Sequence, residues 1–462
     1  MVSTSDRPFV LVSNRGPVTF SQDATGALTP RRGAGGLVSG VGPLVARTGA
    51  PWLAAAMTDG DRQAASQGVV DADGFRVRFL ALDPETYRLA YDEVSNKVLW
   101  FAHHGLWDLT REPAFDAGWR DAWAAYREVN QAFADTVAEV APEDAAVLVQ
   151  DYHLCLVAAR LRELRPDLDC VHFHHTPFAP PEWLRPLPDA ARRELLEGLA
   201  AHRRCGFHSA RWADDYASST RSIAGLEPRS FVSPLATDPD DIRNAASSPA
   251  CEAAVAELDE RVGDRTLIGR VDRVELSKNL VRGFQAFDAL LDQHPEHRGS
   301  VVFVANAYAS RSGVPEYAAY RHRMERTVQE INDRWGDEGW EPIVLDVEDD
   351  FPRSVALLRR ADVLLVNPIR DGLNLVVSEA ALVNDRDAVL ALSPEAGAWE
   401  RFEPGVVEVP PFDIAGTAEA LHAALTMPAS ERAARASVLR TLAEERTPAH
   451  WLADQLRAAD RA

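Results

Sequence analysis

Cysteine, positive charge and long apolar runs are all scarce in this chain of 462 residues, and each scarcity excludes a class of protein. Only four cysteines occur, at positions 155, 170, 205 and 251, and no CxxC pair is present. A disulfide framework or a cysteine zinc site is therefore not expected. We expect four reduced core thiols, as is typical of a cytoplasmic protein.

Acidic residues outnumber basic ones, 70 to 49, which gives a formal charge of -21. This balance argues against a broadly basic surface, so neither nucleic acid nor anionic lipid is an expected partner. No apolar run approaches the roughly 20 residues that span a bilayer, and the first residues lead directly into a strand without a signal region. We expect a soluble intracellular protein, and self-association into a homo-oligomer stays open.

Short β-rich runs alternate with amphipathic stretches, which predicts an α/β protein with parallel sheets and crossover helices. The expected strands cover 9–13, 146–150, 170–174, 266–269, 301–305, 342–346, 362–366 and 388–392. The length exceeds one usual hydrophobic core, so two Rossmann-like domains facing a central cleft are expected. Turn-forming residues place the connection near 235–245, and the predicted divisions are 1–240, 241–440 and a C-terminal helix at 441–462 that packs back on the N-terminal domain.

The run IRDGLNLVVSEA, at 369–380, lies between an apolar strand and a helix, where open α/β sheets bind ligands. Asp371 can accept hydrogen bonds from sugar hydroxyls. The amides of Leu375 and Val376 in the first helical turn can hold a diphosphate, and Glu379 can bind a ribose. The pattern also occurs as plain scaffold, so this prediction needs further support.

A second turn, GRVDRVELSKN at 269–279, carries Arg270, Arg273 and Lys278 after another predicted strand. Such a cationic turn is a candidate clamp for a leaving diphosphate, because arginine and lysine neutralise the growing charge. A solvated surface turn is the alternative.

Near the N-terminus, Arg15 follows the first strand, and Gly35 and Gly36 precede a helical pattern. These glycines let the backbone approach a phosphate. The loop matches neither the dinucleotide-binding glycine pattern nor the phosphate loop of ATPases, so those two enzyme classes are disfavoured.

Polar and aromatic residues at other strand ends complete the candidates. Asp151 and His175 follow two strands and are expected to face the cleft, His175 as a hydrogen-bond donor or as a core histidine. Tyr91 and Trp100 can stack on a sugar ring or belong to the core. The histidines of 171–175 alternate between faces without a carboxylate at ligand spacing, so no metal is expected.

Taken together, these strings resemble the trehalose-6-phosphate synthase family of retaining glucosyltransferases over nearly the whole chain. The matching elements are SNR, AGGL, SNKVLW, DYHL, HTPF, ASRSG, RDGLNLVVSEA and the basic residues of VDRVELSK. The resemblance implies the B-type glycosyltransferase fold, no cofactor and no metal. It also implies a nucleotide-glucose donor bound by the C-terminal domain and a glucose 6-phosphate acceptor bound by the N-terminal domain.

The resemblance implies specific roles for these residues. The acceptor residues would be Arg15, Gly36, Tyr91, Trp100, Asp151 and Arg311, the donor residues Asn374, Leu375, Val376 and Glu379, and the residues at the reacting centre Arg273, Lys278, His175 and Asp371. In the implied reaction the acceptor attacks from the face that the diphosphate leaves, and no enzyme nucleophile is required.

The chain also departs from the family pattern. Glu275, Leu276 and Asn279 replace the family's Asp, Tyr and Gly beside the clamp, and an aromatic pair is reduced to Trp52. Carboxylates in DVEDDFPRS, at 346–354, can pair with the N1 and N2 hydrogens of guanine, which favours GDP-glucose slightly over UDP-glucose; alternatively, they face solvent.

Two other functions stay open at this stage. One is a relative that couples a nucleotide-cyclitol to an aminocyclitol phosphate. The other is a non-catalytic sugar-phosphate sensor, which retention of the clamp disfavours.

Overall fold

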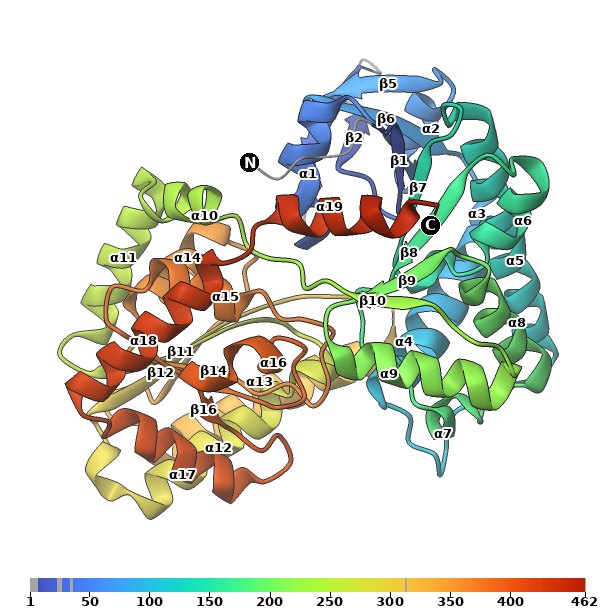
Figure 1. Cartoon of the computed structure of the whole chain (residues 1–462). Coiled ribbons are helices and arrows are strands. Elements are labelled where there is room, and N and C mark those ends of the chain that lie inside the picture. The colour runs from blue at the N-terminus through green and yellow to red at the C-terminus, as the bar shows by residue number, and fades with distance from the viewer. Residues whose placement is uncertain (1–6, 23–26, 34–35, 312–313, 462) are drawn as a thin grey trace. The chain divides into compact units, whose positions relative to one another are not determined.

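The computed structural model, drawn in Figure 1, describes residues 7–22, 27–33, 36–311 and 314–461. The chain divides into two compact units. Unit 1 comprises Met1–Leu235 and Pro448–Ala462, and unit 2 comprises Ala236–Thr447. Each unit is a parallel sheet covered by helices, so the α/β prediction is confirmed.

Unit 1 has an eight-stranded sheet in the order β10-β9-β8-β7-β1-β4-β6-β5, in which only β5 runs antiparallel to its neighbour. A separate antiparallel pair, β2 and β3, follows β1. The strands are β1 Phe9–Val12, β2 Val18–Gln22, β3 Leu28–Arg32, β4 Pro51–Ala55, β5 Val69–Ala72, β6 Phe75–Leu80, β7 Ala146–Gln150, β8 Asp169–Phe173, β9 Arg204–Phe207 and β10 Ser230–Val232.

The helices of unit 1 include a long π-helix, η1, which packs against α5. They are α1 Gly36–Thr48, α2 Asp59–Ala65, α3 Pro84–Arg88, η1 Leu89–Leu99, α4 Trp100–His104, α5 Ala117–Val140, η2 Tyr152–Leu154, α6 Val157–Leu164, α7 Pro181–Leu184, α8 Asp189–Ala200, α9 Ala210–Ser219, η3 Thr220–Ala224 and α19 Pro448–Ala459. Helix α19, red in Figure 1, packs on α1, β7, β8 and β9, with Trp451 fully buried.

The last helix of unit 1 is also held by ion pairs around Asp169, at the start of β8. Its carboxylate lies 2.7 Å from Arg7, 3.3 Å from Arg203 and 3.0 Å from Arg461. Because three guanidinium groups share one nearly buried carboxylate, segments from the beginning, middle and end of the described chain meet here.

Unit 2 has a six-stranded, fully parallel sheet in the order β13-β12-β11-β14-β15-β16. Its strands are β11 Thr266–Arg273, β12 Val301–Tyr308, β13 Ile343–Asp346, β14 Val363–Val366, β15 Val389–Leu392 and β16 Val407–Glu408. Its helices are α10 Pro239–Ala246, α11 Pro249–Val262, η4 Leu276–Lys278, α12 Leu280–Gln293, η5 Pro295–His297, α13 Pro315–Trp335, α14 Phe351–Arg360, α15 Val376–Val383, α16 Trp399–Phe402, η6 Glu403–Gly405, α17 Ile414–Leu425 and α18 Ala429–Glu444.

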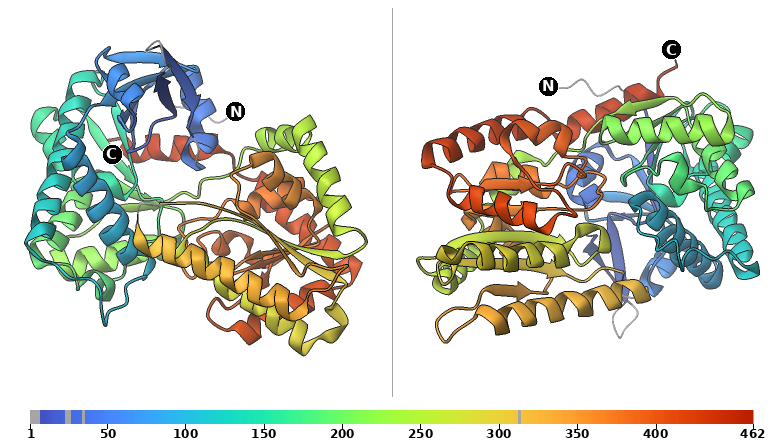
Figure 2. Two further views of the ribbon diagram at one scale, coloured as in Figure 1. Left: turned by 180° about the vertical axis from the view of Figure 1, so that it is seen from behind. Right: turned by 90° about the horizontal axis from the view of Figure 1, so that it is seen from below.

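Strand periodicity explains the layers of unit 2. In β14, Val363 and Leu365 join a core with α12, α13 and α17, whereas Leu364 and Val366 join a core with α10, α11, α14, α15 and α18. Alternate side chains of a strand point to opposite faces, so both faces of this sheet are buried, and Figure 2 shows helices on both sides of these strands.

All eight strands expected from the sequence are present. The four cysteines are buried and free. Among the described residues, none of the helices combines the length and the apolar character that a membrane span requires.

Candidate active site

The cationic turn of unit 2 follows β11 and is partly buried. Lys278 Nζ lies 2.7 Å from Asp371 Oδ2 and 3.5 Å from Asp272 Oδ1. Burial acts to lower the pKa of Lys278, but Asp371 and Asp272 outweigh it and hold the pKa above its ordinary value. Lys278 is therefore a positive charge in the folded protein, joined to the loop that the sequence assigned to the donor sugar.

Asp371 is held in that loop by backbone and side-chain contacts. Its N–H donates to Glu395 O at 3.0 Å, and its carbonyl accepts from the Gly397 amide at 3.0 Å. Its carboxylate accepts from Asn374 Nδ2 at 3.2 Å, and Asn374 stands at a φ of 81°. Asparagine tolerates this left-handed conformation, so it suits the turn that leads into α15.

Two further arginines of unit 2 converge on Glu275. Glu275 Oε1 lies 2.9 Å from Arg273 and 2.7 Å from Arg311, and it accepts from Ser310 Oγ at 2.9 Å. Burial acts to raise the pKa of Glu275, but Arg273, Arg311 and Lys278 outweigh it and lower the pKa to about 2. One carboxylate thus holds two guanidinium groups. The sequence grouped Arg311 with the acceptor residues, and the structure places it in unit 2 beside the clamp.

A count of charges shows what this region attracts. A buried Arg270 pairs with Asp272 at 2.9 Å. The turn and the two residues paired with it from outside, Arg311 and Asp371, together hold four cations, Arg270, Arg273, Lys278 and Arg311, and three carboxylates, Asp272, Glu275 and Asp371. One positive charge is in excess here, although the whole chain carries -21. A local positive excess favours an anionic ligand such as a diphosphate.

The start of α15 adds backbone donors. The residue before it, Leu375, makes no side-chain cap, so the first amides of the helix, from Val376 onward, have no partner within it. One turn on, burial raises the pKa of Glu379 to about 7. A helix N-terminus with a nearby carboxyl group can hold a phosphate and a ribose hydroxyl.

Asn279, which departs from the family pattern, fits its position. It stands at a φ of 64°, and its Nδ2 donates to Asn367 O at 3.0 Å and to Pro411 O at 2.7 Å. Asparagine adopts this conformation more readily than other non-glycine residues. The replacement therefore keeps the backbone of the clamp turn and adds two hydrogen bonds.

The carboxylates of the acidic loop at 346–354, which the sequence assigned to a guanine base, contact an arginine of the same segment. Arg353 lies 3.1 Å from Asp346, 3.7 Å from Glu348 and 3.8 Å from Asp350. Asp350 also accepts from the Arg353 amide as the N-cap of α14. Since one arginine engages three of these carboxylates, a guanine base would have to compete with it.

In unit 1, three of the predicted acceptor residues lie together. Arg15 donates to the Tyr91 hydroxyl at 2.9 Å, and the Tyr91 ring stacks on His153 at 5.6 Å. His153 Nδ1 in turn lies 4.0 Å from Asp151 Oδ2. Tyr91 belongs to the π-helix η1, a helix type that is often found at functional sites.

Asp151 has a strained backbone, with φ 71° and ψ 166°. This region is almost exclusive to glycine and costs of order 1–3 kcal/mol. One contact supports this backbone conformation: Asp151 Oδ1 accepts from the Tyr152 N–H at 3.0 Å. Strain of this kind clusters at functional sites, which agrees with a role for Asp151 in binding.

The other two acceptor candidates in unit 1 are Trp100 and Gly36. Trp100 is only 6% exposed, and His104 stacks on its ring at 3.9 Å. This burial favours the core alternative for its ring faces. Gly36 begins helix α1, whereas Gly35 lies outside the described residues.

His175 is the centre of a hydrogen-bonded chain through unit 1. The Leu235 amide, which can only donate, meets His208 Nδ1 at 3.2 Å, so His208 carries its proton on Nε2. That nitrogen lies 3.2 Å from His175 Nδ1, which leaves the His175 proton on Nε2, 3.0 Å from Gln150 Oε1. Burial lowers the pKa of His175 to about 3, so this tautomer is neutral.

The chain continues to α19, because Gln150 Nε2 donates to Gln455 Oε1 at 3.0 Å. Both ring nitrogens of His175 are therefore engaged within unit 1, and a hydrogen bond from its ring to a substrate would have to replace Gln150. Sequence reasoning did not find Gln150, His208 or Gln455. The buried polar residues Gln150 and Gln455 on otherwise apolar elements were the available signal.

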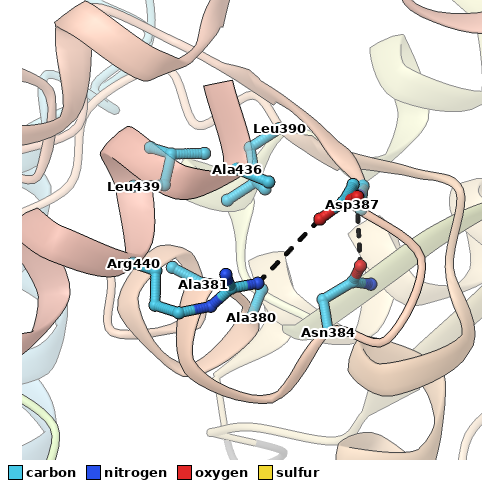
Figure 3. A pocket seen from close by; sticks show the side chains of 9 residues that line it. Ala380, Ala381, Asn384, Asp387, Leu390, Ala436, Leu439 and Arg440 are labelled. Atoms are coloured by element: carbon cyan, nitrogen blue, oxygen red, sulfur yellow. Dashed lines mark hydrogen bonds and ion pairs between the residues drawn. The ribbon is translucent and has the colours of Figure 1, made fainter. Parts of the chain in front are cut away.

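One small cavity lies between α15 and α18 of unit 2 (Figure 3). It is lined mainly by alanine and leucine side chains, with Asn384, Asp387 and Arg440 at its edge. Its volume of about 10 Å³ has room for about one water molecule, so it is a packing gap rather than a sugar site.

Two Rossmann-like units, each a parallel sheet between helices, define the B-type glycosyltransferase fold. Solved structures with this fold match nearly the whole chain. An E. coli structure bound with UDP-2-fluoro glucose superposes with a TM-score of 0.85 at 28% identity, covering 97% of this chain and 99% of that chain. A UDP-forming alpha,alpha-trehalose-phosphate synthase from Burkholderia xenovorans in complex with glucose-6-phosphate gives 0.85 at 29% identity, covering 98% and 99%.

The family model for glycosyltransferase family 20 matches residues 7–461, and the chain belongs to that family of glycosyltransferases. A trehalose-6-phosphate synthase from Mycobacterium sp. strain JLS is 31% identical over 95% of this chain and 93% of its own length. A bifunctional trehalose-6-phosphate synthase/phosphatase from Thermoproteus tenax is 32% identical over 96% of this chain, which covers only 62% of that longer protein.

Proposed function

We propose that this glycosyltransferase transfers glucose from UDP-glucose to glucose 6-phosphate and forms trehalose 6-phosphate. The observation that carries the proposal is the family match across residues 7–461. Relatives named trehalose-6-phosphate synthase support it along nearly their whole length. The cytosol is the compartment that we propose, in agreement with four free thiols.

In this proposal unit 2 binds the donor. Lys278 and Arg273 hold the diphosphate together with the first amides of α15, which the excess positive charge of the turn supports. Asp371, supported by Asn374, accepts hydrogen bonds from glucose hydroxyls, and Glu379 binds the ribose. Binding of the diphosphate would draw Lys278 from Asp371 toward the phosphate oxygens.

Unit 1 binds the acceptor in the same proposal. Arg15 and Tyr91, already joined by a hydrogen bond, bind the phosphate of glucose 6-phosphate, with the backbone at Gly36 beside it. Asp151 orients the acceptor hydroxyls. Arg311 stays a proposed acceptor residue on the strength of the family resemblance, and Trp100 supports the site through packing.

The reaction exchanges one bond at the anomeric carbon of the donor. The bond to the departing diphosphate oxygen breaks, and a bond to the acceptor's anomeric oxygen forms on the same face. The departing phosphate oxygen takes the acceptor's proton, so no protein nucleophile is consumed. The chain supplies positioning and charge stabilisation, while neutral His175 lines the reacting centre without exchanging a proton.

The donor base that we propose is uracil rather than guanine. Relatives whose names specify the product are UDP-forming, and nothing among the comparisons supports the GDP-glucose preference inferred from the sequence. The engagement of Asp346, Glu348 and Asp350 by Arg353 weakens the physical argument for guanine as well.

The test is product formation from glucose 6-phosphate with UDP-, GDP- and ADP-glucose in parallel, in EDTA, read by mass spectrometry. We expect a disaccharide phosphate with UDP-glucose. The same product from GDP-glucose alone would overturn the assignment of the base. No product from any donor would favour coupling of cyclitols, and nucleotide binding by calorimetry without turnover would favour a sensor.

A further inference from the structure

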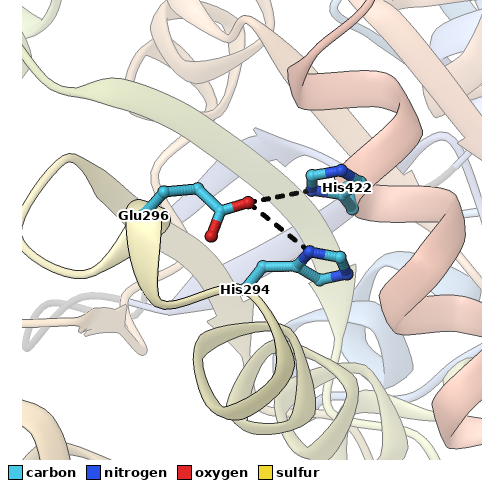
Figure 4. A group of neighbouring side chains, drawn as sticks. All are labelled: His294, Glu296 and His422. Atoms are coloured by element: carbon cyan, nitrogen blue, oxygen red, sulfur yellow. Dashed lines mark ion pairs between the residues drawn. The ribbon is translucent and has the colours of Figure 1, made fainter.

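A cluster of imidazole and carboxylate groups lies in unit 2 away from the clamp turn and α15. His294 follows the last residue of α12, Glu296 belongs to η5, and His422 lies on α17 (Figure 4). The rings of His294 and His422 lie 128 positions apart in the sequence (422 − 294), yet they stack with centroids 3.7 Å apart and planes within 9°. The proposed reaction uses none of these side chains.

The spacing of their nitrogen and oxygen atoms suits a metal ion. Glu296 Oε1 lies 3.5 Å from His294 Nδ1 and 4.0 Å from His422 Nδ1. One ligand atom from each of the three residues falls within 4.8 Å of the other two. Ligands at about 2.0–2.2 Å from a tetrahedral zinc ion stand roughly 3.3–3.6 Å apart. Each imidazole ligates within its own ring plane, so the His422 ring has to turn out of the parallel stack to direct Nδ1 at an ion beside His294.

The hydrogen-bond donors and acceptors around His294 favour a cation beside its ring. Its Nε2 lies 3.0 Å from Glu419 Oε1, and its Nδ1 faces Glu296 Oε1 at 3.5 Å. A neutral imidazole has one N–H and cannot donate to both carboxylates. If Nε2 donates to Glu419, the lone pair of Nδ1 faces the negative charge of Glu296, and a cation between them removes the repulsion.

The same arrangement matches the surroundings of known metal-binding histidines. A ligating histidine usually donates its second ring nitrogen to a carboxylate, which orients the ring and increases its basicity. Glu419 stands in that place for His294.

His297 provides the neighbouring polar contact. Its Nε2 lies 3.0 Å from His422 Nδ1. His297 therefore contacts the atom of His422 that a metal would take. Metal binding at His422 would open this hydrogen bond, so the ring of His297 should report occupancy.

We propose that His294, Glu296 and His422 bind a divalent transition cation of the zinc and nickel class, with Glu419 orienting His294. Imidazole nitrogen and carboxylate oxygen are ligands that such ions accept. The bound ion would join the end of α12 to α17 and stabilise unit 2, since a ligand that binds only the folded state raises its stability.

The test uses the full chain, free of affinity tags and treated with EDTA, which is then dialysed away. Zinc titrations by calorimetry would compare the unchanged protein with His294→Ala and His422→Ala. The matched control is His322→Ala, an exposed histidine on α13. We expect the unchanged protein and His322→Ala each to bind one more equivalent of zinc than His294→Ala and His422→Ala do. Zinc should raise the Tm of the unchanged protein and of His322→Ala only.

Two further measurements distinguish one specific zinc site from non-specific binding at the surface. Glu419→Gln should weaken zinc affinity roughly tenfold while keeping the stoichiometry, because it removes only the orienting carboxylate. Zinc should also shift the ring signals of His297 in NMR spectra. Equal stoichiometry and affinity in the unchanged protein and in His294→Ala, or no saturable binding at all, would overturn the proposal. Circular dichroism identifies any variant that fails to fold, and Glu296→Gln then replaces it.

Discussion

Gln455 of helix α19 accepts a hydrogen bond from Gln150 at the end of β7, 3.0 Å from Oε1 to Nε2, although 305 positions separate the two residues. Gln150 is fully buried, and its carbonyl oxygen accepts from His175. The last helix of unit 1 therefore determines which way the Gln150 amide points. The amide oxygen in turn accepts the proton that the contact with His208 leaves on His175 Nε2.

Gln455→Met is expected to weaken this chain. The replacement has a similar shape but no acceptor, so one Gln150 N–H is left unpaired in the interior at a cost of about 1–3 kcal/mol. Urea unfolding should show that loss, and the Nε2 signal of His175 should shift in NMR spectra, while the contact with His208 keeps the tautomer. If the stability and the His175 signals stay as in the unchanged protein, Gln455 does not hold the Gln150 amide in place.

The stability of unit 1 should fall as the pH drops below about 6.5, the ordinary value for histidine. Burial lowers the pKa of five of its histidines, to about 3 for His175 and about 4 for His202; the others are His172, His174 and His208. Between the folded and unfolded pKa values the unfolded chain binds more protons, so the free energy of unfolding decreases as pH falls.

Each such histidine contributes at most about 1.4 kcal/mol per pH unit. Urea midpoints measured between pH 7.5 and pH 5 would give the slope before most carboxylates titrate. His202→Gln removes one titrating group and should make the slope shallower by up to that amount. A midpoint that does not change across this range would contradict the buried, neutral state of these histidines.

Asp151→Gly should separate stability from activity. Glycine adopts the backbone conformation of Asp151 without strain, so the variant should gain up to about 1–3 kcal/mol, less the lost contact with the Tyr152 amide. It should also bind glucose 6-phosphate more weakly, since the carboxylate is gone. Asp151→Asn, which keeps the strain and the size, is the control. Asp151→Gly with unchanged stability and an unchanged KM would exclude both parts of this explanation.

Lys278→Ala should lower kcat more than it raises the KM for the nucleotide sugar, because its charge acts mainly as the leaving group separates. The same change leaves Asp272 and Asp371 without their shared cation, so a loss of stability is expected as well. Lys278→Arg, which keeps the charge, should recover the stability and part of the turnover. If only the KM changed, Lys278 would be a binding residue.

The sequence predicted five of the six strands of the unit 2 sheet, because strands such as β14 are continuous apolar runs. In the eight-stranded sheet of unit 1 it predicted only three, β1, β7 and β8. It could not predict the π-helix that carries Tyr91, since its period differs from that of the α-helix pattern used to find helices. The RDG run and the cationic turn were recognised from local motifs. Their contact, Lys278 to Asp371, depends on the pairing of β11 with β14, which no local motif specifies.

Burial accounts for most of what the sequence could not show at the candidate site. The sequence names Glu275 as a departure but does not reveal that its carboxylate holds both Arg273 and Arg311. The histidine cluster of unit 2 was missed for a similar reason. His294 and His422 come from two segments far apart in sequence, and only the packing of α12 against α17 brings them together.

The ion pairs of Asp169 with three arginines can be completed only after the end of the described chain has been synthesised. Arg7 and Arg203 are made long before Arg461, and the whole of unit 2 is translated between them. Unit 2 is continuous and can fold as soon as it leaves the ribosome, as domains generally do. The face of the unit 1 sheet that Trp451 covers stays exposed until α19 has left the ribosome. In the cell the N-terminal half of this protein is thus the later of the two to be finished.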